Sequence, residues 1–291
     1  MGEWPFHPGE LEAQERAGGG PPGAGIRDFM TDQHREFFQA LPYVVVAAVD
    51  RGWPAATMLA GEPGFVSTPD PFTLHVAAQL DPSDPSHAAL ALARPAGILG
   101  IDLATRRRNR ENGVIAAASA NGFTLGVRQS FGNCPKYIHL REVRRAARTA
   151  GAVEPLSDLD GDARAAVSGA DTFFVATSAR TNELEGGVDI SHRGGPPGFA
   201  QLRGDTLTIP DFRGNRYFNT LGNMVSDPRT ALLFVDFARG DLLHLQGHAD
   251  IVWDGPEVRA FQGAERLWRI RVERAWRRRG AVPLSWTPAS R

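Results

Sequence analysis

The stretch GNRYFNTLGN, residues Gly214–Asn223, gathers side chains that donate hydrogen bonds and directly follows the strand-like run DTLTIP. Arg216 within it and Arg213 just before it can each present a planar fork of donors to a phosphate. Gly214 and Gly222 let the backbone come close to a ligand. The neutral donors of the stretch are Asn215, Asn219, Thr220 and Asn223. We therefore expect an anion-binding loop; the alternative is a turn shaped by Asn and Gly with solvated arginines.

Two further clusters contain side chains suited to an anion. The run ATRRRNRENG holds four arginines within five positions, which repel one another on a strand unless solvent or an anion separates them. The run FGNCPKYI holds the only cysteine and the only lysine of the chain, two residues apart. From these clusters we expect cofactor contacts by Arg106, Arg110, Asn133, Cys134 and Lys136. A lone cysteine is more often a small buried filler, and nothing in the sequence positions a base to make Cys134 a nucleophile.

An internal repeat relates the two halves of the chain. GEPGF, which begins at Gly61, recurs as GPPGF 134 residues later. The same offset pairs LGIDLA (Leu99–Ala104) with LFVDFA (Leu233–Ala238), and Asn-Gly at 112–113 with Gln-Gly at 246–247. An unbroken offset over some fifty residues predicts two similar structural units in tandem.

The repeat breaks down at the donor-rich loop. Residues 214–223 align with LDPSDPSHAA (Leu80–Ala89), where aspartates and prolines replace the arginine and the amides. If both loops only connected strands, there would be little reason for one of them to be so much richer in donors. We therefore expect only the second half to bind the anion.

Short apolar runs separated by turn residues predict a mainly β fold with a few short helices. YVVVAAVD (Tyr43–Asp50) and GWPAATML read as a hairpin, and even strand spacing favours two small antiparallel barrels. We expect helices capped by Thr31 and by Asp254, the latter with Val258, Phe261, Ala264 and Leu267 on one face. The expected boundaries are a flexible tail (1–25), a first barrel (26–150), a linker (151–170) and a second barrel with the phosphate site (171–291).

The composition narrows the classes of function. With a formal net charge of −1 and no apolar run long enough for a bilayer, we expect no nucleic-acid or membrane partner and a cytoplasmic location. One cysteine excludes an intrachain disulfide, and the histidine spacing predicts no metal site. The sequence also lacks GxGxxG after a strand, a P-loop and GxSxG.

Three stretches resemble a known family: FGNCPKYI, PDFRGNRYFNTLGNMVSDPRTALLFVDF and GDLLHLQGHADI. They are similar to flavin-binding proteins related to pyridoxamine 5′-phosphate oxidase, most of all to large two-barrel members, over residues 30–286. The resemblance implies split β-barrels and FMN at the junction of two barrels, here an intrachain pseudo-dimer with homodimerisation left open. Carried onto this sequence, it implies flavin contacts by Asp189, Ser191, His192, Arg193, Arg213, Asn215, Arg216, Asn219 and Asn223, with Gln246 as a polar position on a later strand.

The resemblance implies an FMN-dependent oxidoreductase that takes electrons from a donor such as NAD(P)H to a small-molecule acceptor. Because the loop of the first half lacks the donors, we expect one flavin per chain. The arginine–lysine signature of the oxidase that names the family is missing, so we do not expect pyridoxamine phosphate as the substrate. The alternatives are a non-catalytic flavin or heme binder and a reductase that uses the deazaflavin F420. No residue is assigned as a general acid or base.

Overall fold

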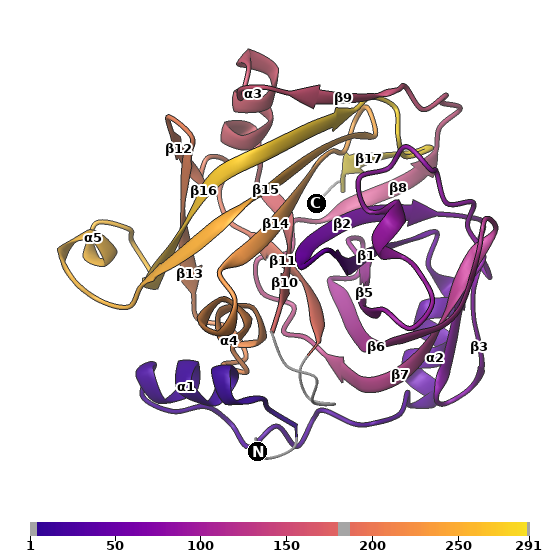
Figure 1. Ribbon diagram of the computed structural model, residues 1–291, viewed down its shortest axis with the longest axis horizontal. Helices are drawn as coiled ribbons and strands as arrows, with labels where there is room; N and C mark the ends of the chain where they lie inside the picture. Colours follow the sequence, from indigo (N-terminus) through magenta and orange to yellow (C-terminus); the bar gives the residue numbers. More distant parts are fainter. Residues whose placement is uncertain (1–4, 180–186, 290–291) are drawn as a thin grey trace.

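The computed structural model describes residues 5–179 and 187–289, which form two antiparallel sheets of the same topology (Figure 1). The first sheet has the order β2-β1-β5-β6-β7-β4-β3, and the second has the order β11-β10-β14-β15-β16-β13-β12. The first contains β1 (Tyr43–Asp50), β2 (Trp53–Ala60), β3 (Val66–Asp70), β4 (Thr73–Val76), β5 (Pro95–Asp102), β6 (Arg107–Ser119) and β7 (Gly122–Gly132). The second contains β10 (Thr172–Ser178), β11 (Val188–Gly194), β12 (Gln201–Arg203), β13 (Thr206–Phe212), β14 (Arg229–Asp236), β15 (Asp241–Val252) and β16 (Ala264–Arg278).

The two sheets reproduce the repeat strand by strand. β5 and β14 begin and end 134 residues apart. A register shift at Asn112/Gly113 on β6 recurs at Gln246/Gly247 on β15. The mainly β fold and the tandem arrangement of two split barrels are therefore as predicted.

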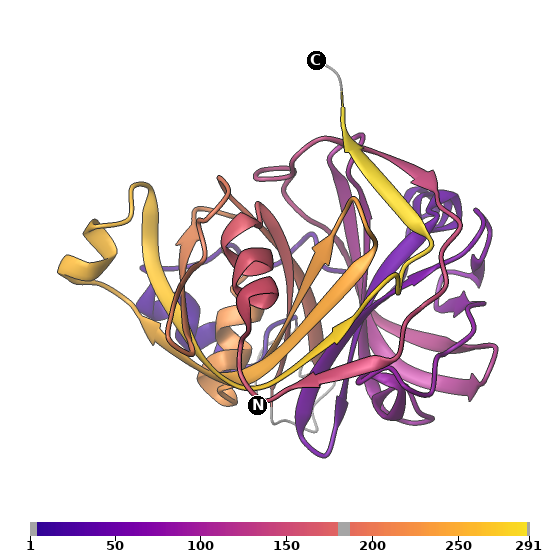
Figure 2. The same ribbon diagram turned by 90° about the horizontal axis from the view of Figure 1, so that it is seen from above.

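Strand alternation builds both the barrel cores and the junction between them. On β1, Val44 and Val46 point into the core of the first barrel, whereas Val45 and Ala47 point to the second half. β10 does the same with Phe173 inside its own barrel and Phe174 at the junction. Figure 2 shows the two barrels side by side, the first in indigo to magenta and the second in orange to yellow. The junction is thus made within one chain.

The helices lie outside the two large sheets. They are α1 (Pro8–Arg16), α2 (Asp32–Ala40), η1 (His87–Ala89), α3 (Gly161–Gly169), α4 (Asn219–Ser226) and α5 (Pro256–Arg259). β9 (Val153–Leu156) pairs with β16, and β8 (Arg141–Arg145) pairs with β17 (Leu284–Pro288). The Thr31 hydroxyl caps α2, as predicted. Among the described residues, no helix is both long and apolar enough to cross a bilayer.

Three local expectations are corrected. Residues 8–16, expected within a flexible tail, form α1, because a buried face of this helix packs against α4. The expected linker (151–170) also adds β9 to the second sheet, while the helix α3 in its middle, which Asp160 caps, agrees with the sequence. The helix at Pro256 has only four residues and is capped by Gly255, because Ala264 already belongs to β16.

Candidate functional site

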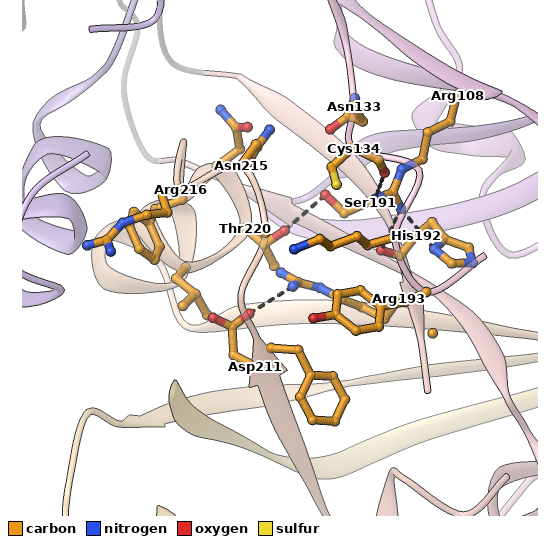
Figure 3. A pocket seen from close by; sticks show the side chains of 18 of the residues that line it. Arg108, Asn133, Cys134, Ser191, His192, Arg193, Asp211, Asn215, Arg216 and Thr220 are labelled. Carbon is orange, nitrogen blue, oxygen red and sulfur yellow. Dashed lines mark hydrogen bonds and ion pairs between the residues drawn. The ribbon is translucent and has the colours of Figure 1, made fainter. Parts of the chain in front are cut away.

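A pocket lies at the junction of the two halves, where the donor-rich loop meets strands from both barrels (Figure 3). The cavity has a volume of about 110 Å³. Eleven of the predicted residues line it: Arg110, Asn133, Cys134, Lys136, Ser191, His192, Arg193, Asn215, Arg216, Asn219 and Thr220. The fold therefore brings the three sequence clusters together at one place.

A buried carboxylate behind the pocket ties the two halves together. Oδ1 of Asp189 on β11 accepts hydrogen bonds from Arg110 Nη1 and Asn112 Nδ2 on β6, both at 2.8 Å. Oδ2 of Asp189 accepts one from Asn223 Nδ2 on α4 at 3.0 Å. Arg110 is 3% exposed and also donates to the hydroxyl of Ser191. This network fixes the Arg110 guanidinium at the base of the pocket.

A second arginine sets the protonation of a histidine in the pocket. Arg108 Nη1 lies 2.9 Å from His192 Nδ1, and a guanidinium can only donate, so Nδ1 accepts and the ring hydrogen is on Nε2. Burial, followed by the charges of Arg108 and Arg193, lowers the pKa of His192 well below its usual range. Burial, followed by the charges of Arg110 and Arg193, lowers the pKa of Arg108 to about 10, so it stays cationic at neutral pH. His192 is therefore a neutral hydrogen-bond donor.

Five buried polar atoms of the pocket residues have no hydrogen-bond partner among the described residues. They are Nε of Arg108, Arg110 and Arg193, Nδ2 of Asn133 and Nε2 of His192. All five are donors under the tautomer derived above. Buried donors are normally paired, so this donor set suits a ligand rich in acceptor oxygens and negative charge.

The other wall of the pocket combines acidic and aromatic side chains. Asp211 accepts hydrogen bonds from Arg193 at 2.8 Å and from Arg266 at 2.6 Å. The ring of Tyr137 stacks on Phe212, with centroids 5.4 Å apart. This wall offers a flat apolar surface next to the arginines that line the pocket.

Residues 159–280 match the family model described as pyridoxamine 5′-phosphate oxidase. The matched residues run from just before α3 to the end of β16. Among solved structures, the chain is similar to HupZ from Group A Streptococcus (18% identity, 40% of this chain and 90% of that one, TM-score 0.33). It is also similar to a putative pyridoxamine 5′-phosphate oxidase from Lactobacillus delbrueckii (12% identity, 42% and 97%, TM-score 0.33). A FAD-binding protein from Mesorhizobium loti is a third (13% identity, 44% and 97%, TM-score 0.31). No curated protein matches the chain.

Five predicted residues lie away from the pocket or behind it. Asp189 and Asn223 form its supporting network. Arg213 is exposed. Its backbone carbonyl accepts a hydrogen bond from the hydroxyl of Tyr137, a residue that lines the pocket, at 3.3 Å. Arg106 is exposed in the turn before β6, with a left-handed φ of 57°. Gln246 donates to the carbonyl of Pro54 at the junction position related to the pocket by the repeat.

Arg216 lines the pocket, yet its guanidinium has other partners. Nη2 donates to the carbonyls of Ala17 and Gly19, each at 2.6 Å. Figure 3 shows the side chain pointing away from Arg108 and His192. In the structure Arg216 therefore fastens the N-terminal segment, and a phosphate contact by this side chain stays a prediction.

Sequence reasoning missed Arg108, Asp211, Tyr137 and Arg266 as lining residues. Arg108 could have been predicted from the sequence, because residues 106, 108 and 110 share one face of an extended strand. The strand begins only at Arg107, so position 106 falls outside it. Asp211 and Tyr137 lie within the stretches that resemble the family, but nothing in their residue types marked them as lining residues.

The repeat places a counterpart position on the other side of the junction. At the 134-residue offset, Ala55 replaces Asp189, Thr57 replaces Ser191 and His244 replaces Arg110. A cavity of about 230 Å³ lies near the corresponding loop, and Arg278, which lines it, forms ion pairs with Asp81 and Asp84. The counterpart therefore lacks the carboxylate and the guanidinium that correspond to Asp189 and Arg110, and its own Arg278 is paired with two aspartates.

The buried His192 predicts a pH dependence of stability. Its folded-state pKa lies below the unfolded value of 6.5, so unfolding takes up a proton below that pH. Its contribution is fully present above pH 6.5 and is lost as the pH falls toward the folded-state pKa, by up to about 1.4 kcal/mol per pH unit. The contribution of His192 to the free energy of unfolding is measured by urea unfolding of the wild type and of His192→Asn at pH 7 and at pH 5. The wild type should lose more stability than the variant, whereas equal losses would contradict the assignment.

Proposed function

We propose that this chain binds one FMN in the pocket at the junction and acts as an FMN-dependent oxidoreductase. The observation that carries the proposal is the set of unpartnered buried donors at the base of the pocket, as found among the described residues. The family match supports it, because the matched residues supply β11, the donor-rich loop and α4. A phosphate ester is the kind of ligand that such donors recognise.

The residues present fit an FMN phosphate. Arg108, Arg110 and Arg193 would supply charge, and Asn133 and His192 would supply neutral donors to the phosphate and other polar groups. Bound FMN would supply the electron-transfer chemistry.

The protein's own part in the chemistry is positioning and electrostatics. Because burial and nearby guanidinium groups disfavour a charged ring, His192 would donate a hydrogen bond rather than act as a general acid. Lys136 is exposed at the pocket, and among the described residues no carboxylate lies within ion-pair distance of its ammonium. It would attract an anionic electron donor such as NAD(P)H.

We expect about one FMN per polypeptide, because Ala55 and His244 stand at the counterpart position in place of Asp189 and Arg110, and the Arg278 guanidinium there is already paired with Asp81 and Asp84. FMN released by denaturing the purified protein and quantified by absorbance against total protein measures the ratio. A ratio near two would contradict the asymmetry. A Soret band, or a deazaflavin in the extract, would contradict FMN itself.

Oxidoreductase activity is tested separately from binding. Under anaerobic conditions, NADH or NADPH should bleach the visible flavin absorbance, and a small acceptor or oxygen should restore it. Protein that holds FMN but is reduced by neither nucleotide would favour a non-catalytic flavin binder.

A further inference from the structure

The N-terminal segment, residues 5–19, lies against the donor-rich loop and α4. Figure 1 shows α1, in indigo, directly beside α4. The contact is close because it runs through two glycines. A Cβ on Gly9 would collide with the carbonyl oxygen of Gly222, and a Cβ on Gly222 would lie 2.5 Å from Cα of Glu10. No side chain fits between the two helices at this point.

His7 connects this segment to the network behind the pocket. Its Nδ1 accepts a hydrogen bond from the backbone of Gly9 at 3.1 Å, so its Nε2 is the donor to Oδ1 of Asn223 at 2.8 Å. With its oxygen held in this way, Asn223 directs its Nδ2 to Asp189. Asp189 in turn holds Arg110 at the base of the pocket.

Glu10 makes a second connection, to a residue that lines the pocket. Its carboxyl group is buried and accepts from the backbone of His7 and from Nδ2 of Asn219. This fixes the amide so that Oδ1 of Asn219 lies 3.4 Å from Arg110 Nη1. Burial, followed by the charge of Asp189, raises the pKa of Glu10 well above its usual range.

The far end of the segment is held by the donor-rich loop itself. The Arg216 guanidinium, at a residue with a left-handed φ of 62°, donates to the carbonyls that follow α1. Both ends of α1 are therefore attached to the elements that build the pocket. A segment serving only to cover apolar surface would not need these directed contacts.

We propose that residues 5–19 are a third component of the cofactor site, in which His7 and Glu10 position Asn223 and Asn219, and that docking of α1 is coupled to occupancy of the pocket. This inference rests on the proposed binding of FMN. Coupling of two equilibria is reciprocal: if docked α1 strengthens FMN binding, FMN must strengthen the docking of α1 by the same factor.

Gly222→Ala tests the coupling, because its methyl group would push α1 away without removing any polar group of the network. Gly161→Ala in α3 is the matched control, since a Cβ there meets nothing within 4 Å. We expect FMN, measured by quenching of its fluorescence, to bind Gly222→Ala about 5- to 150-fold more weakly than wild type, the usual range of such couplings. The control should match the wild type.

Hydrogen exchange supplies a readout that a merely structural helix would not change. In the wild type, FMN should slow exchange of the amides at residues 8–16, and this protection should disappear in Gly222→Ala. If that variant proves unfolded by circular dichroism, Glu10→Gln, which keeps the size but offers one acceptor in place of two, carries the same test. Wild-type protein that fails to bind FMN would overturn both proposals. Equal FMN affinity in the variants, with no FMN-dependent protection, would overturn this inference alone.

Discussion

Replacing Arg110 with methionine is expected to lower the free energy of unfolding by about 3–5 kcal/mol and to abolish tight FMN binding. Arg110 is 3% exposed, and it is the only cation that the structure pairs with Asp189 among the described residues. Without it, the Asp189 carboxylate stays buried next to Glu10 with only amide donors from Asn112 and Asn223. Urea denaturation and FMN titration measure the two effects.

The matched control is Arg144→Met. Arg144 is also a strand arginine, but its side chain is 73% exposed and lies 3.7 Å from the exposed carboxylate of Glu142. Surface changes of this kind shift stability by no more than about 0.5 kcal/mol. If the two methionine variants unfolded at the same urea concentration, the buried network would have no special role.

The architecture was predictable because it depends on local patterns that occur twice. Alternating apolar residues on Tyr43–Asp50 and its counterpart on β10 must face a core on one side and the second barrel on the other. The 134-residue offset relates β5 to β14, and the apolar runs at β1 and β10 match slightly out of phase with it. The position of the pocket was predictable for a related reason, since the loop at 214–223 departs from the repeat by gaining donors where its partner has aspartates and prolines.

The N-terminal helix was not predictable from local sequence. The glycine- and proline-rich run at 18–23 favours a flexible chain, and α1 offers only a weak apolar face. Its burial depends on Gly9 meeting Gly222, more than two hundred residues away. The partners of Arg216 could not be predicted for the same reason, because the carbonyls of Ala17 and Gly19 reach it only after that contact forms.

The roles of individual polar residues were only partly predictable. A strand carries its side chains to alternating faces, so choosing Arg110 implied Arg108, which the family motifs do not mark. Gln246 is a different case. It was assigned from its resemblance to a family position, and the repeat places it at the counterpart position, where its side chain donates to the carbonyl of Pro54. Which of two related positions holds the ligand is decided by the surrounding donors.

The counterpart position leads to the second large effect: Arg278→Met should lower the free energy of unfolding by about 3–5 kcal/mol while leaving FMN affinity unchanged. Arg278 is 4% exposed and forms ion pairs with both Asp81 and Asp84. Asp84 is itself buried and, within the described part of the chain, its carboxylate accepts further hydrogen bonds only from Thr57 and Ser86. Loss of the guanidinium leaves that carboxylate without a countercharge.

The triple variant Asp81→Asn, Asp84→Asn, Arg278→Met separates charge from packing, and it should recover most of the lost stability because no buried charge remains unpaired. The number of FMN bound per chain tests whether the ion pairs of Arg278 prevent binding at the counterpart position. We expect one FMN per chain in both variants, since Ala55 and His244 cannot replace the carboxylate and guanidinium of the pocket. A ratio rising toward two in Arg278→Met would mean that the ion pairs alone close a competent second site. The asymmetry would then lie in a single arginine rather than in the whole donor set.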